Sequence, residues 1–234
     1  MTLVAEPRPR PEVRRRRPFW RKPWIIPLGA VVLAFLAFSI PPYTTLDPAL
    51  ARVPVPADSS VYYPALLAHI VFGAVAMVSG FCQVWPWFRG RYKKAHRVLG
   101  RVYVFGGVLP SGVAAFVVGT MSPFGPVGRV SLVLLSVAWV GSTVMGYLKA
   151  RKKSYAEHRI WMIRSYTLTL STITNRIWGP VCSIVLTPHL DTMFGGSEVA
   201  LLYSVAGITN WLGWVLPLLV VELWLQRRRG ARAR

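Results

Sequence analysis

Charge is scarce in this sequence, and negative charge is the scarcest. Asp, Glu, Lys and Arg together make up 15% of the chain, against about 25% in a typical soluble domain. Only eight residues are acidic, and the long apolar blocks contain no pair of carboxylates. The composition therefore argues against a soluble domain, and against acid–base catalysis by paired carboxylates within those blocks.

The chain also lacks the motifs of common hydrolases and phosphate-binding enzymes. It contains no Gly-x-Ser-x-Gly turn, no His-Glu-x-x-His pair and no Gly-Lys-Ser/Thr phosphate loop. The two cysteines, Cys82 and Cys182, are expected near opposite faces of a membrane, so they predict neither a disulfide nor a metal site. Any enzymatic activity would then depend on a cofactor.

Apolar residues are abundant, and they are grouped in six blocks of the length that crosses a bilayer, about 20 residues of helix. The blocks cover residues 24–40, 61–84, 98–120, 130–148, 160–186 and 199–225. The predicted fold class is therefore all-α, a polytopic membrane bundle of six transmembrane helices within residues 24–226. Residues 1–23 are expected to form a basic, disordered cytoplasmic arm, and residues 227–234 a basic cytoplasmic tail.

The basic residues predict the orientation of the bundle. Of the 28 Lys and Arg residues, all but Arg52, Arg129 and Arg176 lie at the two ends of the chain or around the second and fourth gaps between blocks. Because cytoplasmic loops are enriched in Lys and Arg, both termini are predicted on the cytoplasmic side of the inner (plasma) membrane. The basic loops are expected to attract anionic lipid headgroups. Nucleic-acid binding is disfavoured, since no segment remains to form a separate reading module.

Three blocks carry polar or small-residue faces at helical spacing, and in block 98–120 and just before it this face holds His96, Gly100, Tyr103 and Gly107. In block 61–84, His69 shares a face with Gly73 and Gly80, and small residues of this kind let helices approach closely. In block 160–186 and just before it, one face holds His158, Ser165, Thr169, Thr172 and Arg176. Such a face is expected to meet partner helices, water or a ligand rather than lipid.

Arg176 has no acidic residue at its predicted depth. It either extends to the membrane surface or marks an anion site on the outer side, shared with His69, Thr169 and Thr172. Glu222, near the inner end of the last block, is expected to pair with Arg101 or Arg164.

Two His-Arg motifs are similar to those of a known family. They read His-Arg-Val-Leu-Gly-Arg-Val-Tyr at 96–103 and His-Arg-Ile-Trp-Met-Ile-Arg-Ser-Tyr at 158–166, and Ala-His-Ile at 68–70 precedes them. This pattern, over roughly residues 62–176, resembles the bacterial predicted membrane proteins grouped as domain of unknown function 2306. The resemblance implies a multi-pass bacterial membrane protein and leaves its activity unassigned.

The histidines are also similar in arrangement to those of cytochrome b561-type membrane electron carriers, which hold b-type haems between helices. Block 130–148 contains no histidine, so this likeness implies at most one haem, between His96 and His158. The basic neighbours of this inner candidate site, for haem propionates or another anion, are Arg97, Arg101, Arg159 and Arg164.

Three functions therefore remain open. The first is a small redox protein that binds one b-type haem or a quinone near the cytoplasmic face. The second is a transporter or a lipid- or anion-binding membrane protein that uses the outer residues. The third is a non-catalytic subunit or assembly factor of a membrane complex, with a membrane protein as its partner.

Overall fold

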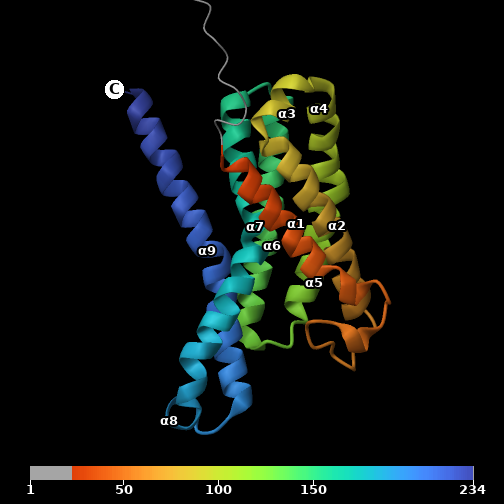
Figure 1. The fold of residues 1–234 in the computed structure, drawn as a ribbon, viewed down its shortest axis with the longest axis vertical. Coiled ribbons are helices and arrows are strands. Elements are labelled where there is room, and N and C mark those ends of the chain that lie inside the picture. The colour runs from red at the N-terminus through yellow and green to blue at the C-terminus, as the bar shows by residue number, and fades with distance from the viewer. Residues whose placement is uncertain (1–22, 234) are drawn as a thin grey trace, which may run out of the picture.

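The computed structural model describes residues 23–233, and every regular element in that range is helical (Figure 1). The predicted cytoplasmic arm falls almost entirely on residues 1–22, outside the described residues. The α-helices are α1 (Ile25–Ser39), α2 (Tyr62–Val84), α3 (Pro86–Arg91), α4 (Lys93–Arg101), α5 (Leu109–Thr120), α6 (Gly125–Arg151), α7 (Tyr155–Leu186), α8 (Leu190–Phe194) and α9 (Glu198–Ala233). Three short 3₁₀ turns, η2 (Pro41–Tyr43), η3 (Pro48–Leu50) and η5 (Thr187–His189), and the π-helical segment η4 (Val102–Val108) complete the chain.

Five stretches are long and apolar enough to cross a membrane. They are Ile25–Tyr43, Tyr62–Val84, Lys93–Thr120, Gly125–Arg151 and Glu198–Arg228. They correspond to five of the six predicted blocks. The sixth block lies in α7, a continuous helix of 32 residues whose polar face sets it apart from the five. The fold is thus a helical membrane bundle, and the count of six spans stays a prediction.

The loops are sorted between the two ends of the bundle (Figure 1). One end, called the basic end below, carries α3, the start of α4 and the turn between α6 and α7, with their Lys and Arg residues. The opposite end, called the cavity end, carries η2, η3, the turn between α5 and α6, and α8. Helix α1 lies across the outside of α2, while α7 packs against both α6 and α9.

The π-helical segment has an identifiable cause. Pro110 has no N–H to donate, and its ring collides with the carbonyl four residues earlier in a regular α-helix. The chain widens its turns just before this proline, and the N–H of Leu109 donates to the carbonyl of Val104, five residues back. The third span is therefore helical throughout, but it is not a uniform α-helix.

The predicted small-residue face of α2 is a seam between helices. A Cβ added at Gly107 of η4 would lie 2.9 Å from Cα of Ala76 in α2, so the two backbones are in close contact there. A Cβ added at Gly80 would overlap the ring of Tyr166 and lie 2.9 Å from that of Tyr103. Small residues thus allow close packing of α2 against η4 and α7, as expected from their spacing.

Candidate functional site

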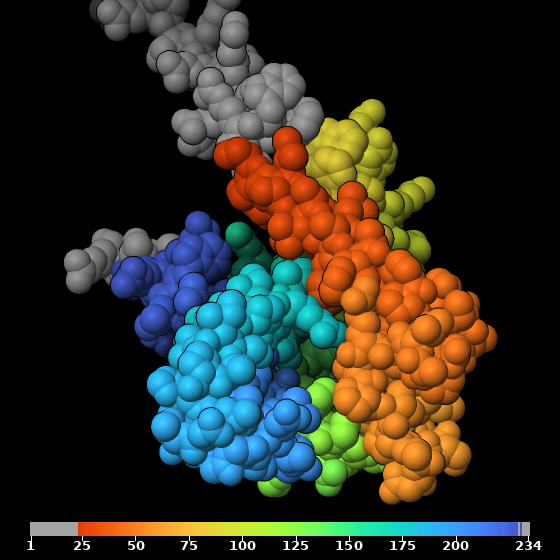
Figure 2. Space-filling view, turned by 60° about the horizontal axis from the view of Figure 1, so that its bottom comes forward, coloured from red at the N-terminus to blue at the C-terminus, as the bar shows by residue number. Residues whose placement is uncertain are grey.

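A cavity of about 420 Å³ lies between α1, α2, α5, α6, α7 and α9. Figure 2, which brings the cavity end forward, shows the surface hollowed between α7 in cyan and the orange residues that follow α1. Most of its wall is apolar, including Phe35, Leu36, Leu66, Ile70, Met77, Leu132, Leu135, Leu168 and Trp214. A cavity of this size and character suits the apolar part of a small ligand.

All four residues of the predicted outer site line this cavity. His69 comes from α2, while Thr169, Thr172 and Arg176 come from successive turns of α7. The polar face of α7 therefore points into the cavity at its outer turns.

His69 is held in one orientation and one tautomer. Its Nδ1 lies 3.1 Å from the carbonyl oxygen of Ser111 and 3.0 Å from the hydroxyl oxygen of the same residue. That hydroxyl donates its own proton to the carbonyl of His69 at 2.9 Å, so toward Nδ1 it acts as an acceptor. Because both partners of Nδ1 accept, Nδ1 carries the proton and Nε2 keeps its lone pair. His69 thus contributes a hydrogen-bond acceptor to the cavity wall.

Two arginines line the cavity. Arg52, in the segment between η3 and α2, donates from Nη2 to the carbonyl of Phe38 at 2.8 Å, and its guanidinium lies 3.8 Å above the Phe38 ring. Arg176 is within electrostatic range of Arg52 and of Tyr43. Ion pairs join Lys149 to Glu157 and Arg164 to Glu222 at the other end of the bundle, and no Asp or Glu is among the described residues that line the cavity. The two guanidinium groups therefore face the cavity without a carboxylate.

Two hydroxyl groups on the cavity wall lack a hydrogen-bond partner. They are the Oγ of Ser39, at the end of α1, and the Oγ1 of Thr209, on α9. Thr209 is 4% exposed, and its side chain lies against Gly179, one turn beyond Arg176 on α7. An unpaired buried hydroxyl costs free energy of about 1–3 kcal/mol, so these two groups lower the stability of the cavity wall.

A network of hydroxyl groups forms the floor of the cavity. Thr169 accepts a hydrogen bond from Nε1 of Trp139 at 2.9 Å and bonds to the hydroxyl of Tyr103 at 2.9 Å. The network continues from Tyr103 to Ser165 and from Ser165 to Thr143, both at 2.6 Å. It ends where Thr143 donates to the carbonyl of Trp139. Because Tyr103, Ser165 and Thr143 are fully buried and each is bonded, this layer is packed and polar but has no spare groups.

The predicted inner site lies away from the cavity, at the basic end. His158 is fixed by a hydrogen bond of 2.7 Å from Nδ1 to the carbonyl of Gly146 and lies within electrostatic range of His96. The Nδ1 of His96 is buried without a partner. Arg97, Arg101 and Arg159 are exposed at this end. None of these residues lines the cavity, so the two predicted sites are separate.

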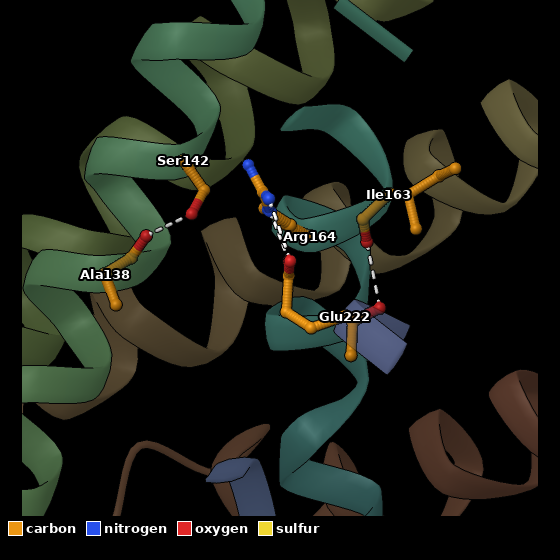
Figure 3. A network of polar contacts seen from close by, with 6 residues as sticks. Ala138, Ser142, Ile163, Arg164 and Glu222 are labelled. Carbon is orange, nitrogen blue, oxygen red and sulfur yellow. Dashed lines mark hydrogen bonds and ion pairs between the residues drawn. The ribbon is translucent and has the colours of Figure 1, made fainter. Parts of the chain in front are cut away.

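Arg164, the last member of the inner set, is bound to Glu222. Its Nε and Nη2 donate to the two carboxylate oxygens, the second bond being 2.9 Å long, and α7 is thereby tied to α9 (Figure 3). Its guanidinium also lies 4.5 Å from the centre of the Trp161 ring. The predicted pairing of Glu222 with a basic residue is confirmed for Arg164, which leaves this arginine committed to a structural contact.

Sequence reasoning missed three residues of the cavity wall as site residues. Arg52 carried a signal, because it is one of the three basic residues outside the cytoplasmic pattern. Ser39 and Thr209 carried none, since single hydroxyl residues are common in membrane helices and only packing shows which of them lack partners.

Comparison with known proteins gives a family and no activity. The model of the family described as "Predicted membrane protein (DUF2306)" matches residues 66–225, well over half of the chain. No curated protein and no solved structure matches the chain. The matched region contains all of α4 to α8 together with His69, Thr169, Thr172 and Arg176. The chain therefore belongs to the DUF2306 family of predicted membrane proteins.

Proposed function

We propose that this protein binds an amphiphilic anion in the cavity, as a lipid- or anion-binding protein or as the binding step of a transporter. The ligand has an apolar body and a phosphate or carboxylate head. The observation that carries the proposal is the pair Arg52 and Arg176, which face a largely apolar cavity whose described lining contains no carboxylate.

The chemistry of the two arginines supports an anionic head. Arg52 and Arg176 are both exposed, and like charges repel even where water screens them, so an anion bound between them lowers that cost. Guanidinium groups match the oxygens of carboxylates and phosphates with parallel hydrogen bonds. The apolar wall then contributes about 0.8 kcal/mol for each methylene group of the ligand that it buries.

The membrane topology belongs to the same proposal. With α7 counted as a span, the bundle has six transmembrane helices and both termini on the cytoplasmic side of the plasma membrane. The support for a sixth span is that the polar side chains of α7 are turned toward the cavity and the hydroxyl network, so lipid does not meet them. In this orientation the basic end is cytoplasmic and the cavity opens toward the outside.

The test compares head groups on one chain. Purified protein in a neutral detergent is titrated with decyl phosphate, decanol and decyltrimethylammonium, and binding is followed by the quenching of tryptophan fluorescence. Decyl phosphate is expected to bind most tightly, and Arg176→Gln or Arg52→Gln to weaken it about ten-fold or more.

Arg129→Gln is the matched control. Arg129 lies at the same end of the molecule but donates to the carbonyl of Ser122, and it does not line the cavity. Its substitution is expected to leave the affinity unchanged. Equal binding of the anionic and cationic probes, or equal losses in all three arginine variants, would contradict the proposal.

A b-type haem at the basic end is a second candidate. A histidine that ligates a metal usually donates its other ring N–H to a carbonyl, which is how His158 is held by Gly146. His96 lies within electrostatic range and has an unpartnered buried nitrogen, so the donor set fits a bis-histidine site. Arg97, Arg101 and Arg159 are the candidate propionate partners, and Arg164 is not, because Glu222 holds it. Such a group supplies one-electron transfer.

Its test is the absorption spectrum of protein expressed with adequate haem supply. Sharp bands in the dithionite-reduced form, lost in His96→Ala and His158→Ala and retained in His69→Ala, are the expected result. A folded and colourless preparation rules the haem out and leaves the cavity proposal untouched.

A further inference from the structure

We infer that the ligand of the cavity is bipolar: besides its anionic head, it carries a hydroxyl or amide N–H at the far end of its apolar body, which donates to Nε2 of His69. This inference rests on the proposed function, because the anionic head is what places the ligand in the cavity. It adds the chemistry of the other end of the ligand, which lies near His69 and the hydroxyl network at the floor of the cavity.

The first step is the hydrogen-bonding capacity of His69. Both recorded hydrogen bonds of the imidazole are made at Nδ1, with the carbonyl and the hydroxyl of Ser111. Gly73 allows this contact, since a Cβ there would lie only 3.3 Å from the Ser111 hydroxyl oxygen. The side chain is therefore anchored by one nitrogen, and the lone pair of the other is available to a donor.

The second step is that the neighbouring polar groups are already satisfied. Trp139, whose ring meets that of His69 edge to face at 6.4 Å, donates to Thr169. The hydroxyls of Ser136 and Ser171 donate to carbonyls of their own helices. The hydroxyls of this side keep acceptor lone pairs after donating, and to them His69 adds the lone pair of Nε2, for which the described chain supplies no donor; an all-apolar ligand would leave that lone pair without a partner.

The third step is the distance between the two ends. Arg176 lies two turns beyond Thr169 on α7, which is about 10 Å along the helix. Thr169 is bonded to Trp139, and Trp139 is in contact with His69, so His69 lies near the depth of Thr169. The two polar ends of the ligand are then about 10 Å apart, roughly the length of a ten-carbon chain.

The experiment uses decanoate, 10-hydroxydecanoate and 10-methoxydecanoate with the wild-type protein, His69→Leu and His189→Leu. Leu removes the acceptor while keeping an apolar side chain, and His189 is an exposed residue outside the cavity. The measured quantity is the ratio of the dissociation constants of decanoate and 10-hydroxydecanoate, and comparing this ratio between the wild-type protein and each variant cancels the general cost of moving a hydroxyl out of water.

The ratio is expected to fall about five-fold in His69→Leu and to stay unchanged in His189→Leu. In the wild-type protein alone, 10-methoxydecanoate is expected to lose the advantage of the hydroxyl, because an ether cannot donate. This measurement holds even if His69→Leu fails to fold. An unchanged ratio in His69→Leu, or a methoxy compound that binds as well as the hydroxy compound, would overturn the inference while the Arg176-dependent binding of decanoate keeps the proposed function. If no acid binds in an Arg176-dependent way, the proposed function fails and the inference with it.

Discussion

Arg164 and Arg176 lie on the same helix, about three turns apart, and face opposite surroundings. Arg164, near the basic end, is held by both oxygens of Glu222 and packs over Trp161. Arg176, near the cavity end, lies within electrostatic range of a second arginine and lines a cavity with no carboxylate in its described lining. Arginine thus joins two helices in one half of the bundle, through Arg164. In the other half, at Arg176, its charge has no carboxylate partner in the described cavity lining.

The hydroxyl groups repeat this contrast. Those of Tyr103, Ser165 and Thr143 are bonded to one another below the cavity, whereas those of Ser39 and Thr209 line the cavity without partners. Satisfied polar groups in a packed layer stabilise a single arrangement, while unsatisfied groups around a space lower stability in exchange for binding. The basic half of the bundle therefore holds the satisfied polar contacts, and the cavity half holds the proposed ligand site.

The largest effect is expected at the seam of the basic half. Gly80→Leu places a side chain where the rings of Tyr166 and Tyr103 now lie, and it should lower the free energy of unfolding by about 3 kcal/mol, because the rings cannot move without disrupting the hydroxyl network. Unfolding by SDS in mixed micelles measures the change. Gly141→Leu is the control, since nothing lies within 4 Å of a Cβ built there. Equal destabilisation by the two substitutions would contradict the view that close packing in the basic half stabilises the fold.

The ion pair between α7 and α9 gives the next effect. Glu222→Gln leaves Arg164 without its counter-charge at a site where the two side chains are 21% and 28% exposed, and it should cost about 2 kcal/mol. Glu157→Gln, which removes the acid of the more exposed Lys149 pair, should cost less than about 0.5 kcal/mol. The same SDS titration compares them. The double variant Arg164→Met, Glu222→Leu is expected to recover most of the loss, and no recovery would show that the charge pair is not its cause.

Within the network, single hydroxyl groups have smaller effects. Tyr103→Phe removes the hydroxyl that joins Ser165 and Thr169 and should cost about 1 kcal/mol. Tyr166→Phe removes a longer bond of 3.3 Å to the carbonyl of Met77, so it should cost less. Thermal unfolding followed by tryptophan fluorescence ranks the two variants. The reverse order would mean that the network is not the main polar contact of this layer.

The helical class and the polar faces were predictable because both depend on local patterns. Hydropathy gives the blocks, and a period of 3.6 residues gives the face of α7 that carries Thr169, Thr172 and Arg176. A constant rise per residue gives depth, which is why His69 and Arg176 could be assigned to the same side of the membrane before any packing was known. Their presence around one cavity is the part of the candidate site that the sequence predicts.

The remainder depends on packing that has no local signature. Arg52 reaches the cavity because the segment after η3 returns to the end of α1, where Phe38 holds it. Thr209 contributes because α9 crosses α7 at Gly179. The wider helical turns of η4 follow from Pro110 in the sequence. The close contact between Gly107 of η4 and Ala76 depends on how α2 packs, which no local pattern reveals. Haem or anion binding at the basic end stays a prediction.

The smallest effect on stability is expected at Arg176, and its sign is opposite to the others. Arg176→Gln removes a charge that has no carboxylate partner among the described residues and lies near Arg52, so it should raise the free energy of unfolding by about 0.5 kcal/mol in the absence of ligand. Arg129→Gln, which removes a hydrogen-bonded arginine at the same end, should not do so. The SDS titration is repeated with decyl phosphate, which is expected to stabilise the wild-type protein and not Arg176→Gln. Since a purely structural arginine destabilises when it is removed, a loss of stability in the ligand-free variant would place Arg176 with Arg164, and the division of the bundle into two halves would no longer hold.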